Sequence, residues 1–237
     1  MSKLNKVAIV QPYVFPYIGY FQLINSVEIF VFYDDVNFIK KGWVNRNNLL
    51  VNKMPSLFTI PLVKPSQNKL INEIDLSIDE KWISAFLNKL THSYCKAPYF
   101  EIIAPLVEGI IRTKKKTIAE LSIVSVMDVA KYMELEIKFK ISSQEFSESK
   151  GMDRSNRLIK ITKELGSSTY INPYGGKELY TKDYFLKNDI DLYFLKPQLN
   201  HYKQFQEPFH PGLSIIDVLM FNDKETIKKE LLNYTLV

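Results

Sequence analysis

The chain has 237 residues, of which 46% are hydrophobic and 24% are charged. This length fits one large α/β domain or two small ones, and the apolar fraction excludes a chain that is disordered throughout. Lysine and arginine exceed aspartate and glutamate by five (31 minus 26). Apart from the run 112–116, the basic residues are dispersed along the chain. This distribution predicts no nucleic-acid binding, whereas the mild net positive charge suits an anionic small substrate.

The first half of the chain begins with a strand, helix, strand pattern and then changes to hairpin and helix patterns. Apolar runs predict buried strands, turn signals separate the β-rich runs, and Asp79 is expected to cap the first of three longer helices. The predicted segments are strands at 6–12 and 28–35, a helix at 17–26, β-rich runs at 37–51, 56–63 and 69–77, and helices at 79–93, 98–112 and 116–133.

The second half alternates strands and helices again and ends in two predicted helices. The predicted segments are strands at 136–142, 169–172 and 191–197, helices at 155–165 and about 181–188, and closing helices at 213–222 and 223–236. Strands that are separated by helices of this length favour a parallel sheet with right-handed crossovers. We therefore predict a single α/β domain over residues 1–237, with a mainly parallel sheet, helices on both faces and a helical C-terminal cover. A β-hairpin-rich insertion is expected at about 37–77 and a helical segment at about 79–133.

The loop after the first predicted strand is the first candidate for a site, because ligands of open α/β sheets bind beyond the carboxyl ends of strands. It lacks the glycine spacing of a dinucleotide fingerprint, and no Walker lysine follows. It offers the amide of Gln11 and the rings of Tyr13, Tyr17 and Tyr20, which can stack on a base or bond a sugar. The alternative is a rigid turn set by its two prolines, with the tyrosines in the core.

The loop after the second predicted strand carries two adjacent carboxylates, Asp34 and Asp35. Neighbouring strand residues point to opposite faces, so at most one of them faces a site. A carboxylate there can bond a ribose hydroxyl, hold a metal-bound water or act as a general base, and we include Asp35 among the catalytic candidates. A ring, two amides and a guanidinium follow, which suit an anionic or polyhydroxylated ligand. These substrate-binding candidates are Trp43, Asn45, Arg46 and Asn47. The alternative is a hairpin with exposed polar faces.

The third candidate loop runs from Asn172 to Tyr180 and follows another predicted strand. Gly175 and Gly176 permit close backbone approach, and a helix N-terminus with Lys177 beside it can bind phosphate. We include Asn172, the two glycines and the lysine among the substrate-binding candidates.

The histidines His92, His201 and His210 lie far apart in sequence and lack the spacing of metal ligands, so we predict no metal site. His201 and His210 lie in loops beyond a predicted strand end. A histidine with a near-neutral pKa can act there as a general base, so both join Asp35 as catalytic candidates.

Two features of the sequence predict a soluble cytoplasmic protein. The single cysteine, Cys95, cannot form an internal disulfide, and no segment has the ~20 apolar residues of a membrane span.

Two polar side chains of the C-terminal region have simpler explanations than catalysis. Ser214 is better explained as a helix N-cap than as a nucleophile. Asp217 lies in an apolar helix and should pair with a residue such as Arg46 or Arg157.

Five segments, "VAIVQPYVFPYIGYF", "FVFYDDVNFIKKGWVNRN", "SYCKAPYF", "RLIKITKELGSSTYINPYGGKELY" and "FHPGLSIIDVLMFN", together resemble the WbqC-like family of bacteria. Genes of this family often lie in O-antigen and other surface-polysaccharide clusters. The resemblance covers nearly the whole chain in order. It is carried by Gln11, Pro12, Pro16, Gly19, Asp34, Asp35, Trp43, Asn45, Arg46, Asn47, Tyr94, Tyr99, Arg157, Tyr170, Gly175, Gly176, Tyr180, Tyr202, Gln204, Ser214 and Asp217.

The resemblance implies a role in O-antigen or lipopolysaccharide biosynthesis, in which a soluble enzyme would act on a nucleotide-linked sugar. We expect a transferase that moves an acyl or aminoacyl group to the amine of a nucleotide-linked amino sugar. The donor would be an acyl or aminoacyl thioester of CoA or an acyl carrier. Asp35, His201 or His210 would be the general base, and Asn45, Arg46 or the glycine loop would stabilise the oxyanion.

Two alternatives remain open. The strand, turn, "GYF" helix start and second strand are similar to nucleotidyltransferases and pantothenate-synthetase-like ligases, which use ATP. Tyr17 and Tyr20 stand where those enzymes have a histidine pair. The second alternative is a non-catalytic protein that binds sugar nucleotides or serves as a scaffold.

Overall fold

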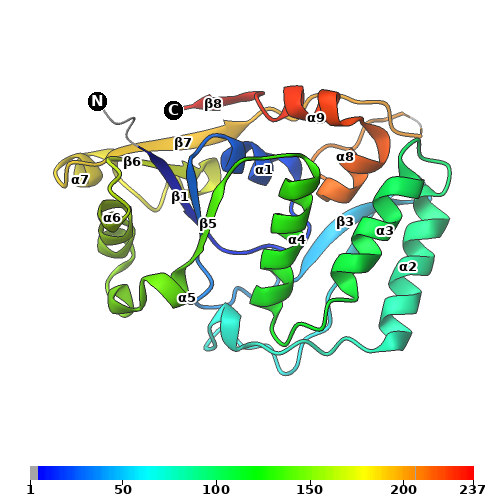
Figure 1. Cartoon of the computed structure of the whole chain (residues 1–237), viewed down its shortest axis with the longest axis horizontal. Helices are drawn as coiled ribbons and strands as arrows, with labels where there is room; N and C mark the ends of the chain where they lie inside the picture. The colour runs from blue at the N-terminus through cyan, green and yellow to red at the C-terminus, as the bar shows by residue number, and fades with distance from the viewer. Residues whose placement is uncertain (1–4, 206) are drawn as a thin grey trace.

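Within the residues that the structure describes, 5–205 and 207–237, six strands form a sheet in the order β5-β2-β1-β6-β7-β8 (Figure 1). The structure is a computed structural model. All neighbouring strands run parallel except β8, which is antiparallel to β7. The strands are β1 (Lys6–Val10), β2 (Ile29–Phe32), β5 (Lys138–Ile141), β6 (Thr169–Pro173), β7 (Asp191–Pro197) and β8 (Tyr234–Leu236). The prediction of a mainly parallel α/β sheet is confirmed.

The strand order divides the parallel sheet into two halves that grow in opposite directions. Counted along the chain, β1, β2, β5, β6 and β7 are parallel strands one to five, so their spatial order is 3-2-1-4-5. This is the order of the first five strands in one common type of doubly wound sheet. The direction of winding reverses between β1 and β6, so the loops after these two strands diverge and leave a crevice at the carboxyl edge.

Helices cover both faces of the sheet, and Figure 1 shows α6 and α7 on the side opposite α2, α3, α4 and α8. Alternation along the strands separates the faces, since Ala8 and Val10 of β1 pack with the larger helical cluster and Val7 and Ile9 with the smaller one. No helix in the described ranges is long and apolar enough to cross a membrane. The helices are α1 (Ile18–Asn25), α2 (Glu80–Tyr94), α3 (Phe100–Ile111), α4 (Ile118–Tyr132), α5 (Ser142–Glu145), α6 (Arg154–Glu164), α7 (Lys182–Leu186), α8 (Ile215–Phe221) and α9 (Lys224–Glu230).

Both predicted helix caps are confirmed. The carboxylate of Asp79 accepts a hydrogen bond from the backbone N–H of Trp82 at 2.7 Å, at the start of α2. The hydroxyl of Ser214 accepts from the N–H of Ile216 at 3.3 Å, at the start of α8. Such caps satisfy backbone donors that have no partner inside the helix.

The predicted β-rich insertion is confirmed only as one hairpin, β3 (Arg46–Val51) with β4 (Met54–Thr59). The strand predicted at 69–77 is wrong, because this segment forms a 3₁₀ turn, η1 (Ile71–Glu73), with isolated bridges on either side. The Glu73 carboxylate accepts from the N–H of Leu70 at 3.0 Å. Such side-chain bonds to the local backbone compete with strand pairing.

The C-terminus also departs from its predicted helix. The sequence pattern predicts a second closing helix over residues 223–236, but α9 ends at Glu230 and residues 234–236 form β8. The backbone N–H groups of Phe194 and Val237 each donate to the other residue's carbonyl, at 2.8 and 3.0 Å. The edge of β7 offers unpaired backbone groups, and pairing them outweighs the helical pattern of the last residues.

Candidate functional site

A cavity of about 400 Å³ lies at the carboxyl edge of the sheet, where the winding reverses. Val10 at the end of β1, Pro173 at the end of β6 and Leu195 near the end of β7 form its sheet side. Its position is the one in which doubly wound sheets bind their ligands. We call it the switch-point cavity; its other lining residues are Tyr13, Tyr17, Gly19, Tyr20, Leu23, Trp43, Gly175, Leu199 and Gly212.

The loop between β1 and α1 is fixed by contacts with three distant elements. Phe15 is fully buried and has a positive φ of 41°, a conformation that costs roughly 1–3 kcal/mol outside glycine. Its carbonyl accepts from Asn47 Nδ2 and from the hydroxyl of Ser214, each at 2.8 Å, and its N–H donates to the Ser125 hydroxyl at 3.1 Å. These bonds hold the loop in the path that presents its tyrosines to the cavity.

Tyr13 and Tyr17 of this loop and Tyr20 of α1 line the cavity as neutral hydroxyl groups. Burial raises the pKa of Tyr13 and of Tyr17, and raises that of Tyr20 well above its ordinary value. The Tyr20 hydroxyl donates to the Gln11 carbonyl at 3.0 Å. A Cβ at Gly19 would overlap with the outer atoms of the Tyr17 ring, so glycine lets the ring lie against the start of α1 without shifting.

The hairpin side chains that the sequence singled out divide into one cavity residue and three that hold the backbone. Trp43, 48% exposed, lines the switch-point cavity. Asn45 donates to the Ile60 carbonyl at 2.9 Å. The Arg46 guanidinium donates to the carbonyls of Gly42, at 2.8 Å, and Lys41, and its Cζ lies 5.7 Å from the Trp43 ring centroid. Asn47 holds the β1–α1 loop and lines a smaller hollow of about 80 Å³ beside the cavity.

The loop after β6 brings Gly175 to the cavity and uses Gly176 for packing. The Asn172 side chain accepts from the Tyr170 hydroxyl at 2.9 Å and lies against Gly176. The ammonium of Lys177 is 5.7 Å from the Tyr174 ring centroid. The short helix predicted near 181–188 is confirmed as α7, which begins at Lys182, whereas residues 174–176 form a 3₁₀ turn, so Lys177 lies before the N-terminus of α7 rather than in its first turn.

The two glycines of this loop should respond differently to the same substitution. A Cβ at Gly176 would overlap with Asn172 Nδ2, whereas a Cβ at Gly175 has no heavy atom within 4 Å. We expect Gly176→Ala to displace Asn172 and to lower the free energy of unfolding by about 1–3 kcal/mol, as overpacking does. Gly175→Ala should change it by less than about 0.5 kcal/mol. Urea unfolding of both variants measures the difference, and equal losses would contradict the packing role of Gly176.

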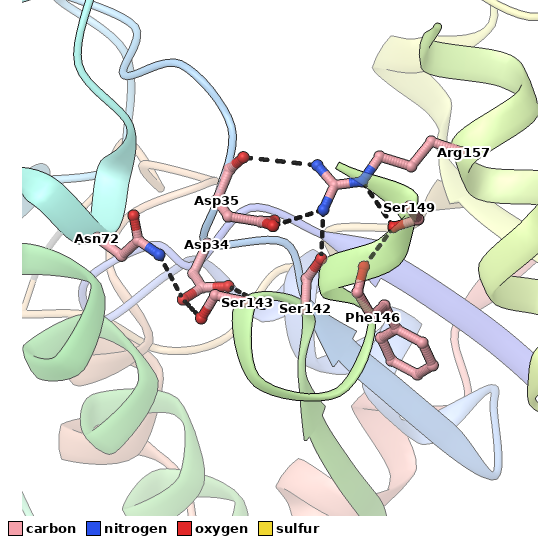
Figure 2. A network of polar contacts seen from close by, with 8 residues as sticks. All are labelled: Asp34, Asp35, Asn72, Ser142, Ser143, Phe146, Ser149 and Arg157. Atoms are coloured by element: carbon pink, nitrogen blue, oxygen red, sulfur yellow. Dashed lines mark hydrogen bonds and ion pairs between the residues drawn. The ribbon is translucent and has the colours of Figure 1, made fainter. Parts of the chain in front are cut away.

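Asp34 and Asp35 point to opposite sides of β2, as the strand period predicts (Figure 2). Asp35, 5% exposed, pairs with Arg157 of α6 at 2.5 Å between Oδ2 and Nη2. Its Oδ1 is buried and has no hydrogen-bond partner within the described residues. Asp34, 3% exposed, accepts instead from Ser143 and from Asn72 on the other face. Neither carboxylate is part of the switch-point lining.

The loop between β7 and α8 carries both candidate histidines, and its residues Leu199 and Gly212 line the cavity. The exposed ring of His201 contacts Glu207, with 2.9 Å between Nε2 and Oε1. His210 is half-buried, and its Nε2 is enclosed with no hydrogen-bond partner in the described ranges. Both histidines therefore belong to a loop that contributes to the cavity lining, although neither ring lines the cavity itself.

The prediction that Asp217 pairs with a basic residue such as Arg46 or Arg157 is wrong. This fully buried carboxylate accepts from the hydroxyls of Tyr94 at 2.9 Å and Tyr202 at 2.5 Å, and from Gln204 Nε2 at 2.9 Å. Burial raises the pKa of Asp217, while these donors and the nearby His210 lower it. Three neutral donors satisfy the carboxylate, whereas Arg157 is already engaged by Asp35.

Of the predicted binding residues, the fold gathers Tyr13, Tyr17, Tyr20, Trp43 and Gly175 around one cavity. Sequence reasoning missed its apolar part, which consists of Val10, Leu23, Pro173, Leu195, Leu199 and Gly212. Leu199 and Gly212 could have been predicted from their place in the sequence, because they belong to the loop that follows β7, and this loop lies at the same edge of the sheet.

A model of the WbqC-like protein family matches residues 11–229. The chain belongs to the WbqC-like protein family. The matched range contains every residue of the switch-point lining except Val10. Among curated proteins, the WbqC-like chain is similar to the "Uncharacterized protein Rv1507c" of Mycobacterium tuberculosis, with 27% identity over 222 residues, which are 92% of this chain and 94% of that protein. No solved structure matches the WbqC-like chain significantly.

Proposed function

We propose that the chain is a transferase that binds a nucleotide-linked amino sugar in the switch-point cavity and moves an acyl or aminoacyl group to the sugar amine. In this proposal the product is a building block of a bacterial surface polysaccharide. The observation that carries the proposal is the place and lining of the cavity: it opens where the strand order 3-2-1-4-5 reverses, and tyrosine and tryptophan rings surround it.

Aromatic rings and neutral hydroxyls suit a base and a sugar. The rings of Tyr13 and Tyr17 can stack on a nucleobase, and their raised pKa keeps the hydroxyls protonated as donors to sugar oxygens. Lys177 and Lys196 lie 5.7 and 5.6 Å from the ring centroid of Tyr174, which directly precedes the cavity residue Gly175. Two ammonium groups at this rim favour a diphosphate.

The cavity also favours an amine in its reactive form. Its lining is mostly apolar and contains no aspartate or glutamate among the described residues. A low-dielectric site disfavours an ammonium ion, so a bound sugar amine would lose its proton more easily there. The neutral nitrogen would then attack the thioester carbonyl, forming a C–N bond as the C–S bond breaks, and the nitrogen proton would pass through a base to the departing thiolate.

His201 is the base that this proposal favours. Its Nε2 contacts Glu207, which leaves Nδ1 to accept a proton and orients the ring. It lies two residues after Leu199, which lines the cavity. The catalytic roles of Asp35 and His210 stay predictions, since Asp35 pairs with Arg157 and the Nε2 of His210 is enclosed.

Thermal denaturation with candidate ligands tests the proposal. We expect a UDP- or TDP-linked amino sugar at 100 times its dissociation constant to add about 2.7 kcal/mol to the free energy of unfolding. Trp43→Ala should weaken this binding at least about tenfold, which corresponds to about 1.4 kcal/mol. The matched control is Ile39→Ala, an exposed neighbour outside the lining. Unchanged binding in Trp43→Ala, or no stabilisation by any nucleotide-linked sugar, would argue against this site.

A second candidate function is an ATP-dependent ligase or nucleotidyltransferase. It is favoured by Tyr17, Gly19 and Tyr20 at the start of α1, which face a cavity at the reversal point of a 3-2-1-4-5 sheet. The same denaturation experiment separates the two candidates. Stabilisation by ATP but not by nucleotide-linked sugars, together with release of pyrophosphate, would favour the ligase.

A further inference from the structure

Asp34 differs from its neighbour Asp35 in lacking a cation. Both carboxylates are nearly inaccessible to solvent, but Asp35 has the guanidinium of Arg157. Asp34 accepts from the N–H and hydroxyl of Ser143 at 2.9 and 2.6 Å, and from Asn72 Nδ2 at 3.3 Å (Figure 2). Within 5–205 and 207–237 no basic side chain pairs with it. A buried carboxylate held only by neutral donors would be stabilised further by a positive group.

A second cavity, of about 300 Å³, begins at this carboxylate. It lies at the carboxyl ends of β2 and β5, with η1 and the first two turns of α4 as its other walls. This volume is at the small end of ligand sites. We call it the Asp34 cavity; its other lining residues are Asn72, Lys115, Thr117, Ala119, Glu120, Ile123, Val124, Ile141, Ser143 and Gln144.

The walls of the Asp34 cavity carry opposite charges and an apolar surface. Lys115 contributes an exposed ammonium. Glu120 is engaged in the cap of α4, where its carboxylate accepts from the N–H groups of Lys116 at 2.8 Å and Thr117 at 3.4 Å. Glu120 is exposed, so Asp34 is the buried carboxylate of this lining. Ile123, Val124 and Ile141 form the apolar part.

We propose that the Asp34 cavity binds a free α-amino acid, with its ammonium group on Asp34 and its carboxylate on Lys115. The ammonium would supply the cation that Asp34 lacks and would donate charge-assisted hydrogen bonds. The apolar wall would take a small hydrophobic side chain, and the amides of Asn72 and Gln144 add polar contacts. A ligand with only one of the two charges would leave one end of the site without its partner.

This site is separate from the switch-point cavity, and its lining shares no residue with that cavity. The inference therefore goes beyond the proposed transferase and does not rest on it. The proposal of amino-acid binding can be confirmed while that of nucleotide binding is refuted, or the reverse. Trp43→Ala should affect nucleotides alone, and Lys115→Gln should affect amino acids alone.

Isothermal titration calorimetry of the full chain with the standard L-amino acids tests the inference. For the best binder, the matched probes are the carboxylic acid without the amine and the amine without the carboxylate. We expect each probe to bind at least about tenfold more weakly than the amino acid. Lys115→Gln and Asp34→Asn should each weaken amino-acid binding by a similar factor, whereas Lys114→Gln, a neighbour outside the lining, should not.

Asp34→Asn disturbs the bonds to Ser143, so Lys115→Gln on the surface decides the outcome if the first variant does not fold. Three results would overturn the inference: no amino acid binds at millimolar concentration, the amine alone binds as tightly as the amino acid, or Lys115→Gln binds like the native chain. Binding that needs both charges and is lost in Lys115→Gln would support it.

Discussion

Arg157→Ala is expected to lower the free energy of unfolding by about 3–5 kcal/mol, because it leaves the carboxylate of Asp35 buried without a cation. Arg157 is 4% exposed, and its guanidinium donates to Asp35 at 2.5 Å, to the Ser149 hydroxyl at 3.0 Å and to the Ser142 hydroxyl at 3.1 Å (Figure 2). Its Cζ also lies 4.7 Å from the Tyr33 ring centroid. Urea unfolding followed by circular dichroism measures the loss.

A double-mutant cycle separates the ion pair from the packing of the arginine. Asp35→Asn in the Arg157→Ala background should recover part of the loss, since a neutral amide replaces the unpaired charge. Lys160→Ala on the same helix is the control. Its ammonium is 3.6 Å from the Glu164 carboxylate and both groups are partly exposed, so its loss should stay within about 1 kcal/mol. If Arg157→Ala costs no more than this control, the buried pair does not hold α6 to β2.

The sheet was predictable because its strands carry local signals that the tertiary structure keeps. Residues 29–32 form a continuous apolar run, which is typical of a strand that is buried on both faces. Residues 191–197 form β7 as predicted. The predicted strand at 69–77 and the last turn of the second closing helix failed for a different reason. Both depend on where the backbone finds a partner, and the partners, Val36 for Ile71 and Phe194 for Val237, are far away in sequence.

The sequence predicts those residues of the candidate site whose placement depends only on the strand that they follow. Residues that follow parallel strands meet at one edge, so Tyr13 and Gly175 could be placed near each other without knowledge of side-chain contacts. Charge partners could not be placed in this way. Asp35 and Arg157 are 122 positions apart, and only the packing of α6 on β2 brings them together. The same limit explains why the sequence pattern suggests the wrong partner for Asp217.

Asp217→Ala is the second substitution with a large expected effect. It removes the acceptor of Tyr94, Tyr202 and Gln204, which belong to α2 and to the loop before α8. A buried donor without a partner costs about 1–3 kcal/mol, so we expect a loss of several kcal/mol, reduced by the removal of a buried charge. Urea unfolding measures it. The control is Asn222→Ala at the end of the same helix, which breaks one local bond, to the Val218 carbonyl, and should cost about 1 kcal/mol.

The charge of Asp217 and its hydrogen bonds contribute to stability with different pH dependence. Burial raises the pKa of Asp217 in the folded chain above its unfolded value of about 3.9, so between these two values the folded state holds more protons than the unfolded state. This carboxylate therefore makes the folded state less stable as pH rises through that window, and its effect is constant above the raised pKa.

Asp217→Asn keeps the shape of the side chain but lacks this titration. We expect the free energy of unfolding of Asp217→Asn, relative to the native chain, to increase with pH across the window and then to level off, because only the native chain is destabilised there. Urea unfolding of both proteins at a series of pH values measures this difference. A difference that does not change with pH would show that the three hydrogen bonds offset the burial of the Asp217 charge in full, and one that decreases would show that they more than offset it.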